Sequence, residues 1–202
     1  MILSKVNLKY CDDIIPIKIN LIYEFFKDLN APYRKDHIDF LEKFGGNNPS
    51  FLKNIEVDCS FEAIKDLYSD ELITKELPAD ACHFLEHKNI MDPCCINREN
   101  GKIYSYDYNE YYSLYYNNIS GLICYGLITN NYIKRYSQSM STIDEMSDRD
   151  IEFFLKENNK FKLDIYIYGT TFFLKDKELY IFCRDSRWLV THSLSKNLLD
   201  LK

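Results

Sequence analysis

The sequence predicts an α+β fold, with a single mixed or antiparallel sheet flanked by helices and a strand-rich C-terminal extension. Two observations lead to this fold class. Apolar residues recur at helical spacing in the first third of the chain, and short segments of alternating apolar and polar residues dominate the last third. With 202 residues, the chain can bury about 70% of the surface that its unfolded form exposes. We therefore expect one domain over residues 1–202.

Two amphipathic helices are expected near the start. In residues 17–29, apolar side chains recur every four positions, and Ile22 and Phe26 lie beside this stripe. Pro32 suits the first turn of a second helix, and Gly45 supplies its C-terminal end. The predicted inner faces comprise Ile17, Leu21, Phe25 and Leu29 in the first helix, and Tyr33, His37, Phe40, Leu41 and Phe44 in the second.

A strand, a helix and a hairpin follow in the middle of the chain. Residues 55–59 alternate between apolar and acidic side chains, and Ser60 is a typical N-cap for the helix that comes next. Residues 94–96 and 102–108 form the expected hairpin, with a glycine-containing turn at 97–101. Its second strand is predicted to carry Tyr104, Tyr106 and Tyr108 on one face.

The remaining residues predict two helices and then strands. One helix is expected over residues 118–130, and Ser147 with Asp150 resembles the capping box of another. The polar residues 137–141 are the predicted joint to the extension, residues 141–202. The expected strands lie at 163–167, 172–174, 179–183 and 188–190.

Composition limits the class of protein. The formal net charge of −6 argues against a nucleic-acid binder, which needs clustered Lys and Arg, and favours a partner with a basic surface. No apolar run is long enough to cross a bilayer, and residues 1–10 lack the continuous apolar stretch of a secretory signal. We expect a cytoplasmic protein that does not bind membranes. The cysteines, expected to be reduced thiols, are Cys11, Cys59, Cys82, Cys94, Cys95, Cys124 and Cys183.

The order of signals over about residues 30–136 resembles the SUKH superfamily of small α+β domains. Ala31-Pro32-Tyr33 and the helix that ends in Phe44-Gly45-Gly46 are similar to one family signature. Cys94-Cys95-Ile96-Asn97 and Asn100-Gly101-Lys102-Ile103-Tyr104 are similar to the family's hairpin, which a helix follows. The resemblance implies an immunity protein that binds and neutralises a cognate toxin, often a nuclease, without catalytic residues. Residues 1–18 and 160–201 fall outside it.

An acidic stretch and a tyrosine-rich hairpin are the candidate partner-binding surface. Residues 56–80 carry eight acidic side chains and two lysines, and residues 104–116 carry seven tyrosines. A solvated acidic face and rings packed on the core would explain the same patterns without a partner. The candidate binding residues are Glu56, Asp58, Glu62, Asp66, Asp70, Glu71, Tyr104, Tyr106, Tyr108, Tyr111 and Tyr112.

A metal centre or a catalytic site is a weaker interpretation. His83 and His87 would share a face if they lay on a helix, close to Cys82, but no C-x-x-C pair accompanies them. A buried thiol with partly exposed imidazoles is favoured instead. No Walker loop, dinucleotide fingerprint, zinc-protease motif or nucleophile elbow occurs. We expect a protein that is not an enzyme and uses no cofactor or metal; a viral or regulatory host-interaction protein on the same fold and a small Cys/His-dependent hydrolase are the alternatives.

Overall fold

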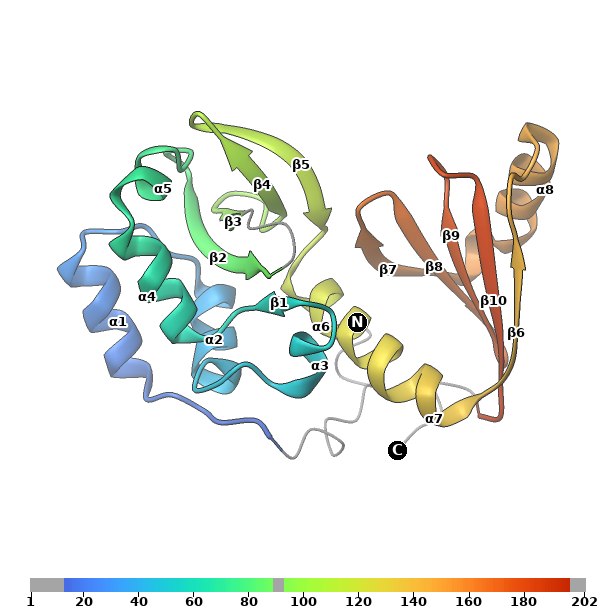
Figure 1. Cartoon of the computed structure of the whole chain (residues 1–202), viewed down its shortest axis with the longest axis horizontal. Helices are drawn as coiled ribbons and strands as arrows, with labels where there is room; N and C mark the ends of the chain where they lie inside the picture. Colours follow the sequence, from blue (N-terminus) through green and yellow to red (C-terminus); the bar gives the residue numbers. More distant parts are fainter. Residues whose placement is uncertain (1–12, 89–92, 197–202) are drawn as a thin grey trace. The chain divides into compact units, whose positions relative to one another are not determined.

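The computed structural model describes residues 13–88 and 93–196, which fall into two compact units, residues 13–119 and residues 120–196. Both combine α-helices with antiparallel β-strands (Figure 1), which confirms the α+β class and the strand-rich C-terminal part. Within the described residues, no helix is long and apolar enough to span a membrane. The predictions for residues 1–10, Cys11 and residues 197–202 lie outside the described residues.

The helices of the first unit follow the predicted pattern. The predicted helix over residues 17–29 is confirmed, but its buried face consists of Ile22 and Phe26, while Leu21 and Leu29 are exposed. The two buried residues are four positions apart, so they also form a helical stripe; it is rotated by one residue from the predicted one. The helices are α1 (Ile19–Asp28), α2 (Lys35–Phe44), α3 (Ser50–Lys53), α4 (Phe61–Ser69) and α5 (Glu71–Lys75).

Helix α2 buries most of the face predicted for it. His37, Phe40, Leu41 and Phe44 are buried, whereas Tyr33 precedes the helix and is exposed. The helix ends at the predicted glycine, where the backbone N–H of Gly45 donates to the carbonyl of Leu41 at 2.8 Å. A side chain at this position would meet that carbonyl at 2.6 Å, so glycine is required by the close backbone approach.

The strands of the first unit pair in chain order. All neighbours are antiparallel, and the predicted hairpin is confirmed because Cys94 pairs with Ser105 and Ile96 with Ile103. The predicted first strand is present but only two residues long. An irregularity in register between His83 and Leu85 interrupts the second strand. The strands are β1 (Val57–Asp58), β2 (Ala81–His87), β3 (Pro93–Asn97), β4 (Ile103–Asp107) and β5 (Glu110–Tyr116).

The second unit contains the four predicted C-terminal strands and one more. Residues 137–141, predicted to be a joint, belong instead to strand β6 (Ser137–Ile143), which pairs with the last strand. Hydroxyl and amide side chains suggested a linker, but they do not prevent strand pairing when a backbone ladder is available. The strand order is β7 (Lys162–Ile167), β8 (Thr170–Lys175), β9 (Glu178–Cys183), β10 (Trp188–Leu194) and then β6.

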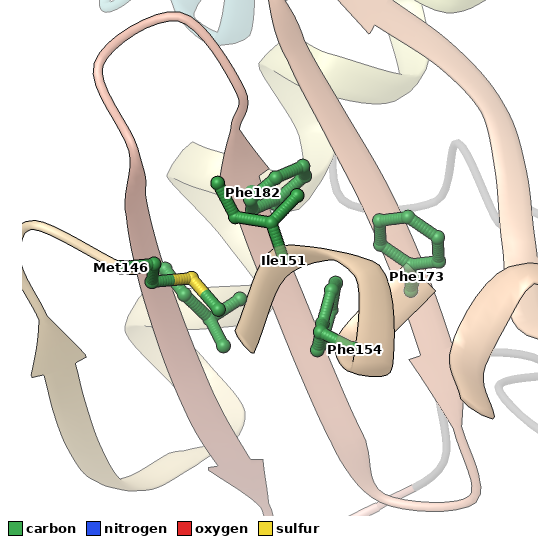
Figure 2. Packing of buried hydrophobic residues seen from close by; sticks show 6 residues of the cluster. Met146, Ile151, Phe154, Phe173 and Phe182 are labelled. Atoms are coloured by element: carbon green, nitrogen blue, oxygen red, sulfur yellow. The ribbon is translucent and has the colours of Figure 1, made fainter. Parts of the chain in front are cut away.

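Helices complete this unit. The predicted helix after the hairpin is α6 (Ile119–Leu127), which continues as a π-helical segment (Ile128–Ile133) and α7 (Lys134–Tyr136). Helix α8 (Asp148–Asn158) begins at the predicted cap, where Ser147 Oγ accepts from the backbone N–H of Asp150 at 3.2 Å. Figure 2 shows how α8 packs on the strands. The buried cluster comprises Met146, Ile151, Phe154, Phe173, Phe182 and Leu189.

Candidate functional site

Helix α4 carries two of the predicted acidic residues on its outer face. Ser60 caps the helix, since its Oγ accepts from the backbone N–H of Ala63 at 3.3 Å. The inner face is buried and consists of Phe61, Ile64 and Leu67. Glu62 and Asp66, one helical turn apart, are therefore turned to solvent. Glu62 forms an ion pair with Lys65 at 2.8 Å on the exposed surface.

Asp70 and Glu71 lie where α4 gives way to α5. Asp70 is the N-cap of α5, because its Oδ1 accepts from the backbone N–H groups of Leu72 and Ile73 at 2.9 and 3.2 Å. Glu71 is exposed and lies 3.7 Å from Lys75. Leu72, which follows Glu71 in α5, is apolar but 73% exposed. Single exposed apolar side chains are common on proteins, so Leu72 indicates a contact surface only together with its neighbours.

Glu56 and Asp58 lie at the other end of α4, beside β1. Asp58 is held locally: its Oδ1 accepts from the backbone N–H of Ser60 at 3.0 Å, and Lys88 Nζ lies 3.5 Å from its Oδ2. The backbone carbonyl of Glu56 accepts from the backbone N–H of Lys88 at 2.9 Å. The acidic stretch thus runs along α4 from β1 to α5 (Figure 1), and Asp58 contributes to the local structure.

The predicted tyrosines do not share one environment. Tyr106 is buried, with its hydroxyl 3.0 Å from Nδ1 of His83, so the prediction that it lies on the binding surface is wrong. Tyr104 and Tyr111 are half-buried, with ring centroids 4.8 Å apart. These rings lie on the face of β4 and β5 against which Ile73 of α5 packs. The cluster around them contains Ala81, Cys95, Ile73 and Leu77.

Tyr108 and Tyr112 are the exposed members, at 77% and 83%. Tyr108 does not share a strand face with Tyr104 as predicted, because β4 ends at Asp107 and Tyr108 lies in the turn with a φ of 47°. Tyr112 follows Tyr111 in β5 and therefore projects from the opposite face of the strands.

One backbone contact fixes the turn beside α5. The N–H of Asn109 donates to the carbonyl of Glu76, the C-cap of α5, at 2.9 Å. Together with the packing of Ile73 and Leu77 on the tyrosine cluster, this bond keeps the hairpin turn at the C-terminal end of the short helix. We name the exposed candidate residues of α4, α5 and the hairpin turn the α5–hairpin surface: Asp66, Asp70, Glu71, Leu72 and Tyr108.

A charged groove lies next to the same cluster and was missed from the sequence. It has a volume of about 680 Å³ and combines residues near the start of α2 with residues of the β3–β4 turn. Arg34 forms an ion pair with Asp36 at 2.8 Å and donates to the carbonyl of Arg98. Asp80, in the wall, accepts from the Tyr111 hydroxyl at 2.7 Å. The lining residues are Tyr33, Arg34, Lys35, Asp36, Asp39, Asp80, Arg98 and Glu99.

The cysteines in the described part of the chain are all buried. Cys82, His83 and His87 lie on strand β2, so the helical arrangement considered for the two histidines is wrong. His83 is fully buried, not partly exposed, and burial lowers its pKa to about 4. Burial also raises the pKa of Cys82 to about 12 and raises that of Cys95. Among residues 13–88 and 93–196, no group of three His, Cys, Asp or Glu side chains could hold a metal ion.

Comparisons with protein-family models, with curated proteins and with solved structures found no match. The resemblance to the SUKH superfamily therefore stays a prediction that rests on the motifs quoted from the sequence.

Proposed function

We propose that this chain is a non-catalytic binding protein of the immunity type, which neutralises a protein toxin by covering a basic cleft. The observation that carries the proposal is the contact between Asn109 and Glu76. It holds the turn that carries the exposed Tyr108 at the C-terminal end of α5, and α5 exposes Leu72 and Glu71. An exposed aromatic ring and an exposed leucine then occur on neighbouring elements with polar groups around them, which resembles the apolar core and polar rim of a protein interface.

Charge complementarity supports a basic partner. A nuclease holds its phosphate substrate with Lys and Arg, and an acidic surface can occupy the same cleft with fast association. Glu62 and Glu71 contact lysines of their own helices, but exposed ion pairs of this type contribute only about 0.3–0.5 kcal/mol. Cations of a partner can therefore replace Lys65 and Lys75 at little cost.

Leu72 and Tyr108 are the proposed anchors. Binding energy at interfaces concentrates in a few large side chains that become fully desolvated, surrounded by a polar rim. Both side chains are more than 70% exposed in the free chain, so both have area to bury. Tyr106, by contrast, is already buried against His83 and contributes to the fold.

The chemistry of the thiols supports a non-catalytic role over a small Cys/His-dependent hydrolase. A nucleophilic cysteine needs a lowered pKa, whereas burial raises the pKa of Cys59, Cys82, Cys95 and Cys124. These thiols stay protonated near neutral pH. The choice of a toxin over a viral or host partner follows from the resemblance to immunity proteins.

A calorimetric titration tests the proposal. The chain is titrated with the purified product of the adjacent gene, and the double variant Asp66→Lys/Glu71→Lys is compared with the wild type. Reversing two exposed charges should raise Kd by about 100-fold or more, because close charge pairs at an interface contribute about 1.5 kcal/mol or more each. The matched control is Glu152→Lys/Glu157→Lys, which reverses two exposed charges on α8 and should leave Kd unchanged. A toxin that does not bind, or equal affinities for the two variants, would contradict the proposal.

A further inference from the structure

Among the described residues, strand β6 lies at the edge of its sheet. It is the last strand in the order of its unit and pairs with β10 on one side, while no strand among the described residues pairs with its other side. All of its residues after Ser137 are exposed, including Met140 at 65% and Ile143 at 53%. The seven residues Ser137–Ile143 include no charge and no proline.

Such an edge is unusual, because exposed strand edges recruit other strands. Natural proteins protect them with charged side chains, proline, bulges or very short strands. In β6 the register with β10 shifts only between Ser193 and Leu194, opposite the first residues of the strand. The ladder from Ser139 to Ile143 is regular. A regular, uncharged edge of this length is suited to pairing with another strand.

The charges that flank β6 indicate that its pairing partner is a second copy of the same strand. Lys134 and Arg135 precede the strand, and Asp144 and Glu145 follow it, all of them exposed. If two copies of β6 pair antiparallel about Met140, the basic segment of each copy lies beside the acidic segment of the other. A parallel pairing would place like charges together, which is destabilising.

The side chains within the strand fit the same register. Antiparallel pairing about Met140 places Ser139 of one copy opposite Ser141 of the other, and Gln138 opposite Thr142. Hydroxyl and amide groups can form hydrogen bonds across such pairs. At the centre, two Met140 side chains with 65% exposure would cover each other. The strand is therefore self-complementary, as a two-fold interface requires.

We propose that β6 is a dimer interface through which two copies of this chain pair antiparallel, centred on Met140. This interface belongs to the unit of residues 120–196 and is independent of the α5–hairpin surface. The dimer would present two toxin-binding surfaces.

Sedimentation velocity of the full chain over the micromolar range tests the proposal. The expected result is a species with twice the mass of the chain. Met140→Lys places two lysines opposite each other at the centre and should raise the dimer Kd by at least about tenfold. Ser186→Lys, which adds the same charge at an exposed turn between β9 and β10, should leave it unchanged. A chain that is monomeric throughout, or a dimer that Met140→Lys does not weaken, would overturn the proposal.

A charge swap tests the antiparallel register itself. Arg135, in the short helix α7 that precedes β6, is expected near Glu145 of the other copy, so Arg135→Glu alone and Glu145→Arg alone should each weaken self-association. An equal mixture of the two variants restores both opposite-charge pairs and should form a heterodimer. Unchanged circular dichroism checks that each variant is folded. A mixture that stays monomeric would overturn the register.

Discussion

His37 should make the unit of residues 13–119 lose stability as the pH falls below 6.5. The imidazole is fully buried, and its ring centroid lies 5.8 Å from that of Phe26 and 5.1 Å from that of Phe84. Neither ring nitrogen has a hydrogen-bond partner among residues 13–88 and 93–196. Burial, which disfavours the charged imidazolium, lowers the pKa of His37 to about 3 from 6.5; Asp36 opposes this effect and His83 adds to it.

The sign and the size of the effect follow from these pKa values. Between pH 6.5 and 3 the unfolded chain binds a proton at His37 that the folded chain does not, so acid favours unfolding. Each decrease of one pH unit below 6.5 lowers the free energy of unfolding by about 1.4 kcal/mol, so that it is about 2 kcal/mol lower at pH 5. His83, with a pKa lowered to about 4 by burial, adds a loss of similar size. The total, about 4 kcal/mol, is a large part of the stability of a typical domain.

Replacing His37 by phenylalanine removes one of the two protonation sites. Trp188, the only tryptophan of the chain, lies in the other unit, so tryptophan fluorescence would not report on this one. Amide hydrogen exchange of α2 and β2 at pH 7 and pH 5 measures the local free energy of unfolding instead. Between pH 7 and pH 5, we expect the free energy of unfolding of His37→Phe to fall by only about half as much as that of the wild type. His192→Gln, in the other unit, is the control and should retain the full loss. A His37→Phe variant with the wild-type pH dependence would refute the account.

Three further substitutions and one control test the local structure by denaturant unfolding. Asp70→Ala removes the N-cap of α5 and should cost about 1 kcal/mol, whereas Asp66→Ala, on the exposed face of α4, should cost almost nothing. Tyr106→Phe leaves Nδ1 of the buried His83 without its partner and should cost about 1–3 kcal/mol without weakening partner binding directly. Gly101→Ala forces a side chain into a φ of 72°, so we expect a loss of about 1–2 kcal/mol; a neutral effect would contradict the turn geometry.

The features predicted well are those that short segments determine. The caps at Ser60 and Ser147 were predicted because a hydroxyl before a helix satisfies N–H groups only three residues away. The end of α2 at Gly45 and the β3–β4 hairpin are local for the same reason. Alternation of apolar residues likewise identified the strands of the last third.

The features that were missed depend on residues far apart in the chain. The groove needs Arg34 and Arg98, which are separated by 64 positions and joined by one hydrogen bond. Tyr106 and Tyr108 look equivalent in the sequence, but one is buried against His83 and the other lies in a turn. Strand β6 carries no apolar alternation because both of its faces are exposed, and its pairing partner β10 lies about fifty residues later.

Exchange mapping of the chain bound to its partner tests the central claim most directly. Amide hydrogen exchange is compared between the free chain and its complex with the product of the adjacent gene. Stronger protection should appear on the outer face of α4, on α5 and in the hairpin turn at Tyr108 and Asn109. Protection confined to residues outside these elements would contradict the account.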